Sequence, residues 1–167
     1  MAARRTGSAW IHGTSPHRWA IAVSYLAGAV VGWVVLDGSG PWWLALVGVD
    51  LGAGVVAHTT TSTAQWYASR SVRAHVWFVV AHLVHLAAMS VAFGVPLAWA
   101  LTTFAFLASG VVIVRSVPRS AALPVAFAVV AVGTAVHAHP LDTASLVPLL
   151  MVKVVAGFGV HARRTGS

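Results

Sequence analysis

The chain has 167 residues, of which 59% are hydrophobic and only 8% are charged. A soluble domain usually carries about 25% charged residues because its surface faces water. Most of this protein's surface is therefore expected to face lipid. The absence of cysteine excludes disulfides, thiolate metal ligands and a thiol nucleophile.

Six apolar stretches are long enough, or nearly so, to cross the roughly 30 Å of a bilayer's hydrocarbon core. They cover residues 19–36, 41–58, 75–93, 96–114, 121–137 and 143–161. Most of the segments between them contain Gly, Pro, Ser or Asp, which are typical of turns. The sequence thus predicts an all-α integral membrane bundle of about six transmembrane helices joined by short hairpin loops.

This transmembrane domain would span residues 19–161, between a cytoplasmic N-terminal segment (1–18) and a cytoplasmic tail (162–167). Residues 59–74 form the one sizeable cytoplasmic connection, which we expect to be a loop. The fifth stretch, 121–137, is the shortest of the six.

All nine arginines fall on one side of this arrangement. They are Arg4, Arg5, Arg18, Arg70, Arg73, Arg115, Arg119, Arg163 and Arg164. The loops on the other side carry only Asp37 and Asp142. Because positive residues gather in cytoplasmic loops, both termini are expected in the cytoplasm. Nine of the ten Lys+Arg residues are arginine, which favours a high-GC prokaryotic genome and hence a multi-pass protein of a prokaryotic plasma membrane.

The tryptophans fit the same boundaries, because indole rings favour the headgroup level of a bilayer. Trp19, Trp66 and Trp77 lie near the expected inner interface, and Trp33, Trp42, Trp43 and Trp99 lie near the outer one. Anionic lipid headgroups then account for the basic face. No nucleic-acid partner is expected.

A stripe of small residues at four-residue spacing marks the first helix. Ser24, Gly28 and Gly32 would let two helix backbones approach closely. The partner helix could belong to a second copy in a homo-oligomer, to another membrane subunit or to the same chain, and packing within the chain is the simpler reading.

Four ionisable residues lie well inside the predicted helices: Asp50, His82, His85 and Lys153. Counting about 1.5 Å per residue from the cytoplasmic ends places all four roughly 10 to 15 Å deep. Charges at that depth are expensive and are usually paired inside a bundle. We therefore expect Asp50 and Lys153 to form an ion pair, with a histidine in contact.

Four interpretations of this polar cluster stay open, and one of them is an intramembrane enzyme. The cluster could only fix helix register in a structural subunit of a larger membrane complex. It could form the coupling site of a proton- or ion-coupled transporter or channel-like protein, since intramembrane Asp, His and Lys are the usual parts of such relays. It could instead bind haem or a metal ion through histidines, for which the weak candidates are His58, His75, His82, His85, His137 and His139.

Residues at the inner end of the second helix suggest a site for an anion or a lipid headgroup. The candidates are Thr59, Thr61, Thr63, Arg70 and Arg73. The alternative is an ordinary polar helix end whose hydroxyls satisfy free backbone groups.

The segment from Lys153 to Gly159 slightly resembles the retinal-bearing last helix of microbial rhodopsins. Those proteins have seven helices, and here the helices after Trp99 lack a tryptophan-rich cage, so retinal is not expected. Ser109 is expected near the cytoplasmic side of the membrane and His137 near the outer side, so they cannot act together as nucleophile and base. We identify no catalytic residue, and an enzymatic activity is the less favoured interpretation.

Overall fold

The computed structural model describes residues 12–13, 17–37, 41–137 and 146–160 of the chain, and these residues contain helices and no strand. Residues 1–11, 14–16, 38–40, 138–145 and 161–167 lie outside the described residues. They include most of the expected N-terminal segment 1–18 and all of the expected tail 162–167, with Arg4, Arg5, His139, Asp142, Arg163 and Arg164. The helices are α2 (Arg18–Asp37), α3 (Leu44–Ala57), α4 (Thr61–Ala68), α5 (Val72–Phe93), α6 (Leu97–Ser116), α7 (Arg119–His137), α8 (Leu146–Met151) and the π-helix η1 (Val152–Gly159).

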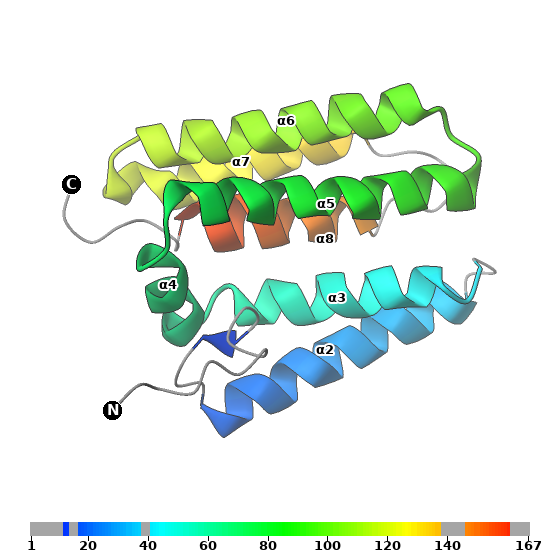
Figure 1. Ribbon diagram of the computed structural model, residues 1–167, viewed down its shortest axis with the longest axis horizontal. Coiled ribbons are helices and arrows are strands. Elements are labelled where there is room, and N and C mark those ends of the chain that lie inside the picture. The colour runs from blue at the N-terminus through cyan, green and yellow to red at the C-terminus, as the bar shows by residue number, and fades with distance from the viewer. Residues whose placement is uncertain (1–11, 14–16, 38–40, 138–145, 161–167) are drawn as a thin grey trace.

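Successive long helices run antiparallel, and they form two groups (Figure 1). The hairpin of α2 and α3 lies on one side, and α5, α6, α7 and α8 lie on the other. The start of α2, the α5 start, the α6–α7 turn and the end of η1 share one end of the molecule, where α4 also lies. All five arginines of the described residues belong to this end, which we call the arginine end.

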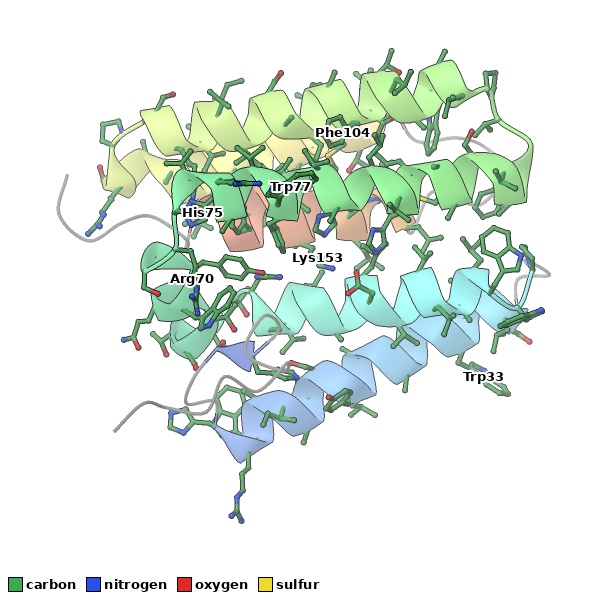
Figure 2. The ribbon with its side chains drawn as sticks, in the orientation of Figure 1. Trp33, Arg70, His75, Trp77, Phe104 and Lys153 are labelled. Carbon is green, nitrogen blue, oxygen red and sulfur yellow. The ribbon has the colours of Figure 1, made fainter. Side chains whose placement is uncertain are left out.

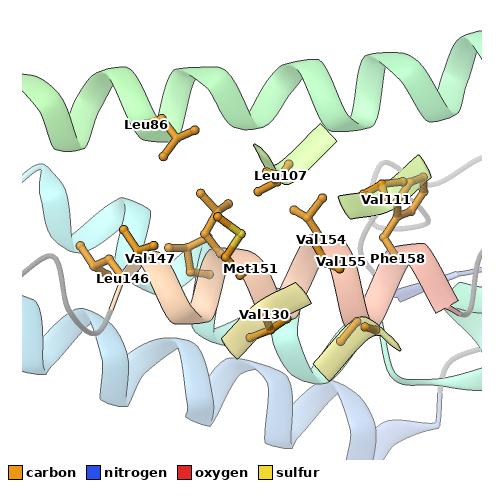
Figure 3. Packing of buried hydrophobic residues seen from close by; sticks show 14 of the residues in the cluster. Leu86, Leu107, Val111, Val130, Leu146, Val147, Met151, Val154, Val155 and Phe158 are labelled. Carbon is orange, nitrogen blue, oxygen red and sulfur yellow. The ribbon is translucent and has the colours of Figure 1, made fainter. Parts of the chain in front are cut away.

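The continuous helix made by α8 and η1 occupies the centre of the larger group. Every residue from Lys153 to Gly159 is buried, as are Leu146, Val147, Leu150 and Met151. Its side chains pack on Leu86 of α5, on Leu107 and Val111 of α6, and on Val130 of α7 (Figure 3). A helix that is apolar on all sides belongs in the middle of a bundle.

The small-residue stripe of α2 packs within the chain. Ser24, Gly28 and Gly32 are buried, and a Cβ atom at Gly28 would lie 2.8 Å from the backbone oxygen of Val49 in α3. On the facing side, a Cβ at Gly52 would lie 2.6 Å from the backbone oxygen of Ala27. The two helices are in backbone contact, so the stripe serves the α2–α3 hairpin.

Four helices are long and apolar enough to cross a membrane: α2, α5, α6 and α7. The pair α3 and α4 also passes that test together, but the two are bent by 91°. The apolar helix Leu146–Gly159 is shorter. All six predicted stretches therefore contain helices, although two of these helices are shorter than expected, and α7 in the fifth stretch has 19 residues.

The prediction of a loop at residues 59–74 is wrong, because this segment contains α4. Thr60 begins that helix by accepting a hydrogen bond from the backbone N–H of Thr63, and Ser71 begins α5 by accepting from Ala74. Serine and threonine at these positions satisfy amides that a helix start leaves free. The polar composition that suggested a loop is thus the composition of two helix caps.

Candidate functional site

One carboxylate joins three helices in the middle of the molecule. Asp50 of α3 accepts a hydrogen bond at Oδ2 from Lys153 Nζ of η1, and the same oxygen lies 2.8 Å from His85 Nε2 of α5. Lys153 Nζ also lies 3.4 Å from the backbone oxygen of Asp50. The expected ion pair with a histidine in contact is therefore present, and Lys153 lies between its own helix and α3 (Figure 2).

The missing side chain of Gly54 makes room for Lys153. A Cβ atom at Gly54 would overlap the Lys153 side chain and would lie 3.0 Å from Nζ. Gly54 is one helical turn after Asp50, so the same face of α3 supplies both the carboxylate and the space beside it. Lys153 is the second residue of the π-helix. Single π turns inside α-helices often occur at functional sites.

The two histidines of α5 lie side by side. The rings of His82 and His85 are stacked, with centroids 5.1 Å apart and planes inclined by 19°. His82 Nδ1 is 2.7 Å from the backbone oxygen of Phe78. Because a carbonyl oxygen and an ionised carboxylate can only accept, His82 Nδ1 and His85 Nε2 are the donors. In neutral rings, the second nitrogen of each is then an acceptor, and both second nitrogens are buried without a hydrogen-bond partner.

The three charged or polar partners differ sharply in exposure. The side chain of Lys153 is 5% exposed, that of His85 is 20% exposed and that of Asp50 is 44% exposed. The lysine is thus sealed behind the carboxylate, which is the accessible member of the pair.

A cavity of about 270 Å³ adjoins Asp50. It is lined by Asp50, Gly54, His58, Tyr67, Trp77, Phe78, Ala81, His82, His85 and Lys153. Asp50, Gly54 and His58 are spaced four residues apart, so the cavity follows one face of α3 from the ion pair to the junction with α4. Trp77 and Ala81 are exposed, so the cavity reaches the protein surface between α3 and α5.

Aromatic rings gather where this cavity approaches the arginine end. The ring of Tyr67 lies 5.3 Å from that of His58, 5.1 Å from Phe78 and 5.2 Å from Phe158. Arg115 lies over the Phe158 ring at 4.9 Å. The inner part of the cavity therefore has aromatic walls.

The other metal-ligand candidates are not brought to the cluster as free ligands. His75 Nε2 is 2.7 Å from the backbone oxygen of Tyr67, and its Nδ1 is 3.1 Å from an Arg115 nitrogen, so both ring nitrogens are engaged. His137 Nδ1 contacts the hydroxyl of Thr103 at 3.1 Å. Within the described parts of the chain, no group of three or more His, Asp or Glu side chains is placed to hold a metal ion.

The threonines and arginines of the suspected anion site have different surroundings. The Thr59 hydroxyl donates to the backbone oxygen of Val56, and Thr63 is buried. Arg70 lies over the ring of Trp66 at 4.1 Å. Thr59 and Thr61 line a second cavity of about 230 Å³ with His17 and Trp19. Neither Arg70 nor Arg73 is among its lining residues.

Sequence reasoning missed two side chains that line the Asp50 cavity. From the sequence alone, Trp77 is expected only at a lipid interface and Tyr67 in a loop. The signal available in the sequence is the aromatic pair Trp66 and Tyr67 inside an otherwise polar segment, which indicates a buried helix face. Both side chains are buried in the structure.

Comparisons with family models, with curated proteins and with solved structures give no match. The chain is therefore described by its own features: an all-helical protein with several helices apolar enough for a membrane, and an Asp–Lys–His cluster beside a cavity.

Proposed function

We propose that this protein is a small proton-coupled membrane transporter whose coupling site is Asp50 with Lys153 and His85. The observation that carries the proposal is that one carboxylate holds both basic partners and is also the most exposed of the three at the cavity. An exposed carboxylate inside a membrane has to face water or a ligand and not lipid, and intramembrane charges beside such cavities mark ion and substrate pathways.

The proposed coupling depends on one carboxylate, Asp50, having two basic partners, Lys153 and His85. A single carboxylate can be neutralised by the lysine, by a protonated histidine or by a proton of its own. Each change alters what else Asp50 can bind, and this linkage is what couples proton movement to the movement of a second species. Histidine suits the relay because its unperturbed pKa is near physiological pH.

The cavity supplies a path from this site toward one face of the membrane. Asp50 and His58 are eight residues apart, or about 12 Å along a helix. The cavity lined by both residues extends from the ion pair toward the arginine end. In the proposed orientation, that end faces the cytoplasm.

The proposed topology has six membrane crossings with both termini inside. It is supported by the gathering of Arg18, Arg70, Arg73, Arg115 and Arg119 at one end. Cysteine replacing Ser69 or Ser116 should be protected from an impermeant thiol reagent added outside cells, whereas cysteine replacing Ser39 should be labelled. Labelling in the reverse sense would contradict this orientation.

In the proposed mechanism Asp50 exchanges its proton with both sides of the membrane even when no second species is bound, so proton movement can be measured without knowing the cargo. In liposomes containing the protein and a trapped pH-sensitive dye, an imposed membrane potential should drive proton uptake faster than in empty liposomes. Asp50→Asn should reduce the rate to that of empty liposomes. Asp37→Asn is the matched control, because it makes the same chemical change at the exposed end of α2.

A folded Asp50→Asn variant with unchanged proton flux would overturn the proposal. The cluster would then be a structural device that fixes helix register. Wild-type protein that is no faster than empty liposomes would also contradict it.

A further inference from the structure

Resting on the proposed function, which leaves the cargo open, we infer that the Asp50 cavity binds a small protonated amine. The inference begins with the unused acceptors. The carboxylate of Asp50 is 44% exposed, and the ring nitrogens His82 Nε2 and His85 Nδ1 are buried without a hydrogen-bond partner. His82 itself is 3% exposed.

These groups define the complementary chemistry. A buried acceptor without a partner costs free energy, which a donor entering the site would recover. The ammonium of Lys153 gives its two contacts to Asp50 and is sealed behind it. The cavity therefore offers the exposed carboxylate of Asp50 to an incoming molecule, and a cation with N–H groups satisfies that acceptor best.

The walls favour a cation as well. Tyr67, Trp77 and Phe78 line the cavity beside the carboxylate. A cation near the faces of such rings is attracted by their electron density, most strongly by tryptophan. A carboxylate and aromatic rings together discriminate against anions and strongly hydrated ions.

The volume of the cavity and the ligands around it restrict the kind of cation that can bind. A volume of about 270 Å³ is below the usual range for drug-sized ligands, about 300 to 1,000 Å³, so the occupant is small. A transition-metal ion would need three or more converging ligands, and the described residues place no such group. An alkylammonium ion needs only hydrogen-bond acceptors and a partly apolar wall.

Binding would also connect the cargo to Lys153. Both are ammonium groups, and both require Asp50. An amine at the exposed side of the carboxylate weakens the hold of Asp50 on Lys153, which links cargo occupancy to the protonation of the cluster.

The test is a binding measurement on the purified full-length protein in detergent. Methylammonium chloride should raise the melting temperature saturably. Tetramethylammonium chloride and sodium chloride at the same ionic strength should have much smaller effects, because neither cation donates a hydrogen bond. Titration calorimetry with methylammonium then gives the affinity.

Two variants locate the site. Asp50→Asn should weaken methylammonium binding at least tenfold, while Asp37→Asn should leave it unchanged. Since Asp50→Asn could unfold the chain, Trp77→Leu serves as a second probe, because Trp77 is 59% exposed and its loss leaves the core intact. It should weaken binding about two- to fivefold, the effect expected of one cation–aromatic contact.

The inference fails if methylammonium acts no more strongly than sodium, if tetramethylammonium binds equally well, or if both variants bind like the wild type. Its failure is separable from that of the proposed function. Amine binding without Asp50-dependent proton flux would leave the site standing and overturn transport. Flux without amine binding would do the opposite.

Discussion

The two sides of α3 are built in opposite ways. Against α2, glycines bring the backbones into contact, so that a Cβ at Gly52 would meet the backbone of Ala27. Against α5 and η1, the same helix presents Asp50, an ion pair and a cavity. One interface is filled to the backbone, and the other keeps space beside charged groups.

Glycine has a different role at each of these two interfaces of α3. Gly52 admits a backbone, which cannot move aside, whereas Gly54 admits the Lys153 side chain, which can. We therefore expect substitutions on the α2 side to affect folding, and substitutions on the other side to affect the state of the ion pair.

Breaking the ion pair should have the largest effect. Asp50→Ala should destabilise the protein by about 3–5 kcal/mol, because it leaves Lys153 charged and without its partner in a low-dielectric interior. Lys153→Ala should cost less, because Asp50 is 44% exposed and keeps its contact with His85. The double variant should recover much of the loss seen in Asp50→Ala. Thermal unfolding of the four proteins in one detergent gives the double-mutant cycle.

Asp37→Ala serves as the control for the loss of a carboxylate and should be close to neutral. Additive losses in the double variant would show that the two charges do not depend on one another. If the double variant recovers stability but not proton flux, the pair belongs to the transport path.

Filling the α2–α3 contact should have the next largest effect. Gly52→Leu inserts a side chain where the Ala27 backbone already lies, which costs about 1–3 kcal/mol or more by overpacking. Ala29→Leu, on the exposed face of α2, is its control. A Gly52→Leu protein with the melting temperature of the wild type would show that the hairpin is looser than the contacts indicate.

Gly54→Ala should have a smaller effect on stability and a large effect on function. The added methyl group overlaps the flexible end of Lys153, so the lysine moves while the backbone stays. We expect a modest change in melting temperature together with a clear change in Asp50-dependent proton flux. Equal flux in Gly54→Ala and wild type would mean that the position of Lys153 is unimportant to the transport step.

Much of the fold could be predicted because its causes are local. The apolar stretches located the six apolar helices of the described residues, and the depth count placed Asp50 and Lys153 at one level. The stripe of Ser24, Gly28 and Gly32 also pointed to a close helix contact.

The remaining features arise from tertiary packing, which has no periodic signature. The helix α4 is held by its buried Trp66 and Tyr67, although its composition is that of a loop. The π-helix Val152–Gly159, which carries Lys153, was not predicted from the sequence. The cavity depends on α3, α4, α5 and η1 together.

The smallest expected effect on stability comes from His12 and Gly13, which pack against α2 and α4. The ring of His12 is buried and lies 5.6 Å from that of Tyr25 in α2, and Gly13, with φ of 76°, lies against Ser62. Burial lowers the pKa of His12, because desolvation disfavours the charged ring. The neutral ring therefore contributes stability above the unfolded-state pKa of about 6.5, and that contribution is lost as the pH falls below it.

Wild type should lose more melting temperature between pH 8 and pH 5.5 than His12→Phe, in which every other histidine is retained. Gly13→Ala, which cannot adopt this backbone angle without strain, should lose the same pH dependence by undocking the segment at every pH. Identical pH profiles for wild type and His12→Phe would show that His12 adds nothing to the α2 side of the molecule.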